Sequence, residues 1–315
     1  MIFTPILKTK KSSEYHALCE MLTIIKSKQN IIPYIESIKS ISNKCVFKYI
    51  DILKDTTLFF EPIQSDVQTV LDCIDSFPLS CIFVLRVRTN TTLEEIDNFI
   101  DVNNKSNRIF GIKIDDADRR YFDFVGKMTN PNYLFVELNG TSYISSSFLD
   151  DLKADKPNCN VIIHSNEREH YIKGKDFKDH DFNLRPNFNF SIVESIKNRT
   201  FSFDGFGSRC SAKNDNTEDV KIARQVTGVF LIYDFNKNNF YTIKSDEEGT
   251  ISFTYYKLKE KLIRERPSID SLFLNNTPIA KRVLTNYLTL EKFSCLKLIT
   301  VSIVRYIEEI IYNLL

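Results

Sequence analysis

Short runs in which apolar and polar residues alternate recur along the chain from its start to Asp204. The clearest run is Ile109–Asp116, and successive side chains of a strand point to opposite faces. One face would therefore be wholly apolar and carry Phe110, Ile112 and Ile114. The other would carry Gly111, Lys113 and Asp115. An apolar face for helices, opposite a face that ends in charge, is typical of a barrel strand with a polar mouth at its carboxyl end.

The same two-faced pattern recurs in seven further runs, each of which ends in a polar residue. These runs are Ile2–Lys8, Ile31–Glu36, Thr57–Glu61, Cys81–Arg88, Tyr133–Asn139, Asn160–His164 and Thr200–Asp204. Strand starts lie about 24 to 29 residues apart through the seventh run, the length of a β-α unit. This alternation predicts a parallel sheet with right-handed crossovers, and the strand count favours an α/β (β/α)8 TIM-like barrel. The alternative is an open, doubly wound sheet, but no G-x-G-x-x-G follows any strand.

Helix signals lie between the strands. Ser65-x-x-Gln68 and Thr91-x-x-Glu94 fit the capping box, and apolar residues follow both at three- and four-residue spacing. After the barrel, residues 228–244 predict two strands joined at Asn236–Asn239, and Thr277-Pro278 predicts a helix start. The stripe from Phe293 to Leu314 predicts a helix that packs on the core or docks a partner protein.

These signals predict one domain overall. Residues 1–210 would form the barrel core, and residues 211–315 would form a hairpin and C-terminal helices packed on it. The 315 residues exceed the ~250 of a simple barrel, which leaves room for such additions.

Bulk composition excludes several classes of protein. Hydrophobic content of 43% and aromatic content of 12% predict a packed core. The formal charge of +1 gives no global field for nucleic acid or anionic membrane. The start of the chain lacks a secretory signal pattern, and the apolar stretch Leu296–Leu315 is interrupted by charges. We therefore expect a cytoplasmic protein that neither spans a membrane nor binds nucleic acid.

Candidate chemistry lies at the predicted mouth, where polar residues end the strands. The candidate catalytic residues are Lys8, Glu36, Glu61 and Asp204. The candidate ligand-binding residues are Arg86, Arg88, Lys113, Asp115, Glu137 and His164. Carboxylates from different strands can hold a divalent cation, and Lys and Arg complement phosphate. The set favours a phosphorylated or nucleotide-like ligand, although mutual ion pairs that merely fill the mouth would give the same pattern.

Two loops add to this picture. In D-G-F-G-S-R-C, residues 204–210, the backbone of Gly205 and Gly207 with the side chain of Arg209 could bind phosphate, or the glycines could serve a plain turn. The long charged connection from Ser165 to Arg199 is expected to be a lid on the functional rim. Its polar residues could be read as metal ligands, but their spacing fits no metal motif: His164, Glu167, Glu169, His170, His180 and Asp181.

Four segments together resemble a known family. The segments are P-I-L-K at Pro5–Lys8, I-I-P-Y-I-E at Ile31–Glu36, S-F-D-G-F-G at Ser202–Gly207 and the hairpin after them. In order and spacing they resemble the beta protein family of satellite phages and prophages, which is TIM-barrel-like. The chain departs from that family in having no Trp and in reading Lys244-Ser245 where a basic residue and glycine are usual. The resemblance implies a role in mobile-element conflict, as phage defence or as control of a partner toxin.

Two functional hypotheses follow. The first is a metal-assisted hydrolase or lyase that acts on a phosphate-containing substrate, with a divalent cation as the candidate cofactor. The second is a non-catalytic regulatory barrel that binds and controls a partner toxin or effector protein. Covalent catalysis ranks below both, because no Ser-His-Asp or Cys-His pairing can be assembled from the sequence.

Overall fold

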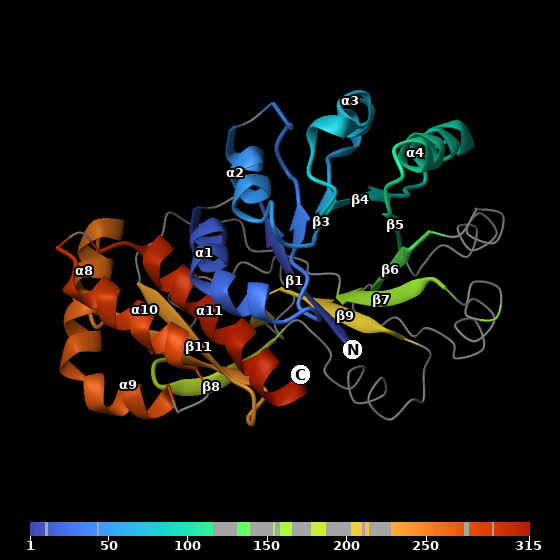
Figure 1. Cartoon of the computed structure of the whole chain (residues 1–315). Helices are drawn as coiled ribbons and strands as arrows, with labels where there is room; N and C mark the ends of the chain where they lie inside the picture. The colour runs from blue at the N-terminus through green and yellow to red at the C-terminus, as the bar shows by residue number, and fades with distance from the viewer. Residues whose placement is uncertain are drawn as a thin grey trace. The chain divides into compact units, whose positions relative to one another are not determined.

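The structure is a computed structural model of the whole chain (Figure 1). It describes residues 1–9, 12–42, 44–115, 131–138, 154, 158–165, 178–186, 203–209, 212–213, 228–273, 277–291 and 293–315. The chain divides into two compact units. The first comprises Met1–Lys11, Thr23–Glu167 and Phe188–Arg209, and the second comprises Ser12–Leu22, Arg168–Asn187 and Cys210–Leu315. Among the described helices, none is both long and apolar enough to cross a membrane.

The first unit is built on a closed barrel of eight strands. They are β1 (Ile2–Lys8), β2 (Tyr34–Glu36), β3 (Leu58–Glu61), β4 (Cys81–Arg86), β5 (Phe110–Asp115), β6 (Tyr133–Leu138), β7 (Asn160–Ser165) and β9 (Gly205–Ser208). Every neighbouring pair is parallel, and β9 closes the ring by pairing with both β7 and β1. The predicted (β/α)8 barrel is confirmed, and the open sheet is excluded.

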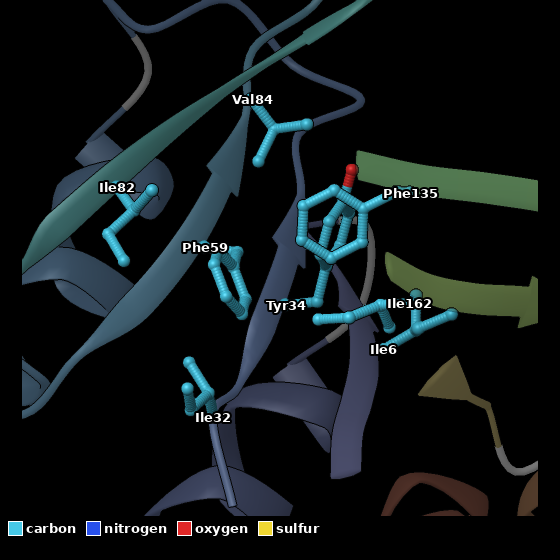
Figure 2. Close-up of a cluster of buried hydrophobic side chains, with 8 residues drawn as sticks. All are labelled: Ile6, Ile32, Tyr34, Phe59, Ile82, Val84, Phe135 and Ile162. Carbon is cyan, nitrogen blue, oxygen red and sulfur yellow. The ribbon is translucent and has the colours of Figure 1, made fainter. Parts of the chain in front are cut away.

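The alternation of faces is also confirmed on the first seven strands. Phe110 packs on Phe99 outside the barrel, with ring centroids 5.9 Å apart. A Cβ added to Gly111 would lie 2.9 Å from the ring of Phe135, which faces the interior. Figure 2 shows the interior apolar cluster, formed by Ile6, Ile32, Tyr34, Phe59, Ile82, Val84, Phe135 and Ile162. The buried rings and branched chains of these residues fill the barrel below its carboxyl end.

The eighth strand lies later in the chain than predicted. The sequence placed it at Thr200–Asp204, but the strand is β9, Gly205–Ser208, and Asp204 precedes it. Glycine is unfavourable in strands, so the pattern gave no signal there. A Cβ at Gly205 would overlap the backbone of Ile2, which shows that the last strand approaches the first too closely for a side chain. Glycine therefore permits closure of the barrel.

The described helices of the barrel lie between its strands. They are α1 (Ser12–Ser27), α2 (Lys44–Ile52), α3 (Val67–Asp72) and α4 (Leu93–Lys105), with short 3-10 turns η1 (Gln64–Asp66) and η2 (Ile74–Ser76). The capping box of α4 uses Thr92 and Glu95, one residue later than predicted. The box predicted at Ser65 is wrong, because Ser65 lies inside η1 and α3 has no side-chain cap. Residues 12–22 of α1 are assigned to the second unit.

The second unit combines an antiparallel sheet with helices. Its strand order is β10 (Ala212–Lys213), β8 (Asp181–Pro186), β12 (Asn239–Lys244) and β11 (Val229–Asp234). The predicted hairpin is confirmed as β11 and β12. The expectation of a lid is wrong for residues 181–186, which form β8 and pair with β12. The helices that follow are α8 (Ile251–Arg264), α9 (Arg266–Leu272), α10 (Pro278–Thr289) and α11 (Cys295–Leu314).

Arg305 on α11 ties this unit together. Its guanidinium donates to the carbonyls of Tyr233 at 3.1 Å and Leu272 at 3.0 Å, and it also contacts the Thr277 hydroxyl. The predicted helix start at Thr277-Pro278 is confirmed, but the Thr277 side chain does not cap α10. Instead the carboxylate of Glu308 accepts from the backbone N–H of Ile279 at 2.9 Å. The predicted apolar stripe is present, with Ile303, Ile307 and Ile310 buried, and the buried arginine with its carbonyl acceptors lies on the same helix.

We expect Gly207→Ala to lower the free energy of unfolding by about 1–3 kcal/mol, because its methyl group would overlap the His164 ring and the Thr4 hydroxyl inside the barrel. Gly249→Ala is the matched control, since a Cβ there would meet mainly the ring of Phe253, which is 39% exposed and can move. Urea unfolding of both variants measures the difference. Equal stability of the two variants would show that β9 does not close the barrel as described.

Candidate functional site

The carboxyl end of the barrel carries a buried group of polar side chains, which we call the carboxyl-end cluster. It draws one residue from each of five consecutive strands, β2 to β6. Its members are Tyr34, Glu61, Arg86, Lys113 and Glu137. Glu61, Lys113 and Glu137 are 3%, 2% and 7% exposed. The strand alternation explains their meeting, because each lies on the interior face predicted from the sequence.

Lys113 lies at the centre of this cluster. Its Nζ is 3.1 Å from Glu61 Oε2 and 3.2 Å from Glu137 Oε2. The guanidinium of Arg86 makes the second bridge: Nη1 is 3.5 Å from Glu61 Oε1, and Nη2 pairs with Glu137. The Tyr34 hydroxyl donates to Glu61 Oε2 at 2.6 Å. Two cations and two carboxylates therefore balance one another, so the cluster carries no net charge.

Three titratable groups of the cluster, Tyr34, Glu61 and Lys113, are each held in one protonation state at neutral pH. Burial alone would raise the pKa of Glu61, but the charges of Lys113 and Arg86 outweigh it and lower this pKa. Burial alone would lower the pKa of Lys113, but the Glu61 and Glu137 carboxylates raise it. Burial, and then the Glu61 charge, raises the pKa of Tyr34 well above its usual value. Efficient acid-base catalysis needs a pKa near the working pH, and none of these three groups provides one.

His164 on β7 lies in the interior beside the cluster and is fully buried. Its ring packs edge-on against Tyr34, with centroids 4.5 Å apart. Burial, and then the charges of Lys113 and Arg86, lowers the pKa of His164 well below its usual value, so the imidazole is neutral. Thr4 Oγ1 donates to the Phe206 carbonyl at 3.3 Å and lies 3.0 Å from His164 Nε2. Nδ1 has no hydrogen-bond partner in the described part of the chain.

Lys8 and Glu36 form an outer pair at the same end of the barrel. They lie opposite each other in the register of β1 and β2, and Glu36 lies opposite Glu61 in the next pair of strands. Lys8 Nζ is 3.9 Å from Glu36 Oε2, and the two side chains are 17% and 20% exposed. This pair is therefore longer and more accessible to solvent than the contacts of Lys113.

The structure brings most of the predicted mouth together but not all of it. Lys8, Glu36, Glu61, Arg86, Lys113, Glu137 and His164 lie on interior positions of the barrel strands. Arg88 lies beyond the end of β4 and is exposed. Asp115 ends β5, but its side chain lies outside the described residues. Most of the residues predicted at the mouth therefore do lie together, on strands β1 to β7.

Asp204 is the clear exception, and its predicted catalytic role at the mouth is wrong. It precedes β9, and its carboxylate accepts from the N–H of Val161 at 2.7 Å, near the start of β7. Parallel strands all begin at one end of a barrel, so Asp204 lies at the amino end, opposite the mouth. Its distance from the mouth follows directly from the misplacement of the eighth strand.

The predicted phosphate-binding turn is also corrected. Gly205 and Gly207 are residues of β9 that pair with β1 and β7, and both positions are packed against neighbouring atoms. They therefore do not form a glycine-rich anion loop. Arg209 follows the last residue of β9 and so lies at the carboxyl end of that strand. Of the three residues predicted to bind phosphate in this turn, Arg209 alone is still a candidate for a site at the mouth.

The described donor groups do not suit a divalent cation. In the part of the chain that the structure describes, no group of three or more His, Cys, Asp or Glu side chains could hold a metal ion. Glu61 already accepts from Tyr34 and Lys113, and Asp204 lies at the opposite end. Of the loop residues, Glu167, Glu169 and His170 lie outside the described residues. His180 and Asp181 belong to the second unit, whereas His164 belongs to the barrel.

Sequence reasoning missed two members of this site, Tyr34 and Thr4. The strand pattern placed Tyr34 on the interior face two residues before Glu36, but its hydroxyl was not recognised as a donor to Glu61. An inward-facing tyrosine has to find a partner for its hydroxyl when buried, and that rule is a usable signal. Thr4 lies in the middle of β1, and nothing in the pattern marked it.

Fold and site together define the class of protein: a (β/α)8 barrel with a charge-balanced polar cluster at its carboxyl end. No protein-family model matches the chain, and a search of curated proteins finds no match either.

Replacement of Lys113 tests whether the cluster is a structural network. Lys113→Met leaves two carboxylates facing one arginine in a buried site, so we expect a loss of about 3–5 kcal/mol in unfolding free energy. Lys8→Met is the control, and its longer, more accessible pair predicts a loss of about 1 kcal/mol or less. Urea unfolding gives both values. A Lys113→Met protein as stable as wild type would contradict the network. The double variant Lys113→Met/Glu61→Gln should lose less unfolding free energy than the sum of the losses in the two single variants.

His164 predicts a specific pH dependence. Its folded pKa lies well below its usual value, so the unfolded chain takes up a proton near pH 6.5 while the folded chain does not. The stability that depends on neutral His164 is therefore complete above about pH 6.5 and declines as the pH falls below it. His164→Gln should flatten this decline between pH 7.5 and about 5.5, measured by urea midpoints. His16→Gln, at an exposed helix position, should keep the wild-type slope.

Proposed function

We propose that the carboxyl end of the barrel binds a small phosphate-containing ligand of nucleotide type. Arg86 is the observation that carries the proposal. Its guanidinium is oriented by the buried carboxylates of Glu61 and Glu137, and its side chain is still 17% exposed. A guanidinium held in one orientation presents a planar fork that suits phosphate oxygens.

Two further cations lie at the same end of the barrel and support an anionic ligand. Lys8 ends β1, and Arg209 follows β9, the strand that pairs with β1. Lys8 is 17% exposed and pairs with Glu36 at 3.9 Å, so its ammonium group can be reached from solvent. Active sites of barrels of this class lie at the carboxyl ends of the strands, which is where these cations lie.

The protonation states favour binding over hydrolysis by this cluster. Glu61, the residue predicted as general base, is ionised but accepts from Lys113 and Tyr34, and its pKa is lowered. A carboxylate held in this way is a poor proton acceptor at neutral pH. We therefore propose that Glu61 positions Arg86 and Lys113 for the ligand and does not take a proton from water.

A second candidate function rests on the same charge balance. Buried charges that compensate one another do not require a catalytic role. The barrel can therefore also serve as a regulatory protein that binds and controls a toxin or effector. In this reading the carboxyl-end cluster keeps the mouth rigid, and the partner protein contacts the exposed ends of the strands. The two candidates differ in whether a small phosphate compound binds without any partner present.

We place either function in mobile-element conflict, as anti-phage defence or as control of an element's toxin. The support is the resemblance of four segments to the beta protein family of satellite phages and prophages. All four segments overlap structural elements: Pro5–Lys8 lies in β1, Ile31–Glu36 ends in β2, Ser202–Gly207 ends in β9, and the hairpin is β11 and β12. Phage plating on cells with and without the protein tests this role, and equal plating of a broad phage panel would contradict a defensive one.

Calorimetric titration of the purified chain tests the ligand. We expect AMP and ribose 5-phosphate to bind and adenosine to bind at least tenfold more weakly, because an Arg hydrogen bond to a charged group contributes about 1.5–3 kcal/mol. Arg86→Gln should weaken the two phosphate compounds by about tenfold to a hundredfold. Lys105→Gln on α4 is the control and should leave binding unchanged.

Two outcomes would overturn this proposal. Equal binding of AMP and adenosine would show that the phosphate is not recognised. Wild-type affinity in a folded Arg86→Gln protein, verified by its melting transition, would remove Arg86 from the site. Lys8→Gln provides a second readout, because the outer pair is accessible and its loss is expected to cost little stability.

A further inference from the structure

A separate pocket lies at the opposite end of the barrel strands. It has a volume of about 350 Å³ and lies between the end of α1 and the segments that lead into β2 and β3. Small-molecule sites are clefts of roughly 300–1,000 Å³, so this pocket falls at the lower end of that range. We call it the amino-end pocket, and none of its residues contributes to the carboxyl-end cluster.

The floor of the amino-end pocket is apolar. Ile25, Ile31 and Ile32 line it and are 3%, 2% and 7% exposed. Ile32 also belongs to the interior apolar cluster, so the floor rests on the packed core of the barrel and cannot readily collapse. A ligand that covers this floor must bring an apolar body.

The rim of the pocket is polar and carries an excess of positive charge. Lys26 and Lys28 line it and are exposed, and Asp55 lines it from the segment before β3. Within the described part of the chain, neither lysine takes part in an ion pair or side-chain hydrogen bond that the structure records. Two cations against one carboxylate favour an anionic group at the rim.

We propose that the amino-end pocket binds a small amphipathic carboxylate, with its apolar chain on the isoleucine floor and its carboxylate between Lys26 and Lys28. The proposal concerns a site of its own and does not depend on the proposed function of the mouth. Its ligand class is set by two independent features, the apolar floor and the cationic rim.

Titration of the intact protein with octanoate tests the site, and octan-1-ol serves as the neutral analogue. With the isoleucine δ1 methyl groups labelled for NMR, we expect octanoate to shift the signals of Ile25, Ile31 and Ile32 saturably. The methyl signal of Ile269, which lies in α9 of the second unit, should not move. Octan-1-ol should bind several-fold more weakly, because it offers no charge to the lysines.

Charge changes at the rim give directional expectations. Lys26→Glu/Lys28→Glu should weaken octanoate by about tenfold and leave octan-1-ol unchanged. Asp55→Asn should strengthen octanoate by a few-fold, because it removes a repulsive carboxylate. Lys48→Glu, an exposed lysine on α2 outside the pocket, is the matched control and should bind like wild type. Thr57→Trp places a bulky side chain at the pocket and should abolish both ligands.

Three results would overturn the proposal. One is a shift of the Ile269 methyl as large as those of the pocket isoleucines, which would indicate non-specific binding. Another is equal affinity for octanoate and octan-1-ol, which would remove the role of the lysines. The third is wild-type binding by Thr57→Trp with an unchanged melting transition, which would place the ligand elsewhere.

Discussion

The position of the Lys113 ammonium group between two buried carboxylates is the constraint on which the mouth of this barrel depends. Removing a charge from water is expensive, and only the paired carboxylates of Glu61 and Glu137 make it tolerable at a residue 2% exposed. The same carboxylates orient Arg86, and Glu61 also fixes the hydroxyl of Tyr34. The cations in turn help to keep His164 neutral. One buried lysine therefore sets the orientation and the protonation state of its neighbours.

Closure of the barrel imposes a second constraint, which is steric. The last strand must fit between β7 and β1, and at Gly205 and Gly207 the neighbouring atoms occupy the space of a side chain. The interior next to Gly207 is filled by His164 and Thr4, and the Thr4 hydroxyl also contacts Nε2 of the imidazole. Barrel closure and the chemistry of His164 are thus consequences of the same close packing. A larger residue in β9 would disturb both.

Much of the barrel could be predicted from the sequence, because strand alternation is a local property. The faces of Phe110, Lys113 and Glu61 follow from parity alone, and so does the meeting of charges at one end. The pairings could not be predicted, since the choice of Glu61 as partner for Tyr34, Lys113 and Arg86 depends on the barrel's register. The pattern did not locate the eighth strand, because glycines have no side chain that marks a face. This error placed Asp204 at the carboxyl end of the barrel instead of the amino end. Strand β8 was missed because its partner, β12, lies far away in the chain.

The two ends of the barrel show why the number of charged residues says little about a site. At the carboxyl end, Glu61, Lys113 and Glu137 compensate one another, so a ligand gains only from the charges that also reach solvent. At the amino end, Lys26 and Lys28 are exposed beside an apolar floor, so a small anion there would meet cations without first displacing a buried carboxylate. The binding free energy of a charged ligand depends on which existing contacts of the protein the ligand has to displace. The sequence pattern marked the mouth and not the amino end. A ligand nevertheless has to displace fewer existing contacts at the amino end than at the mouth.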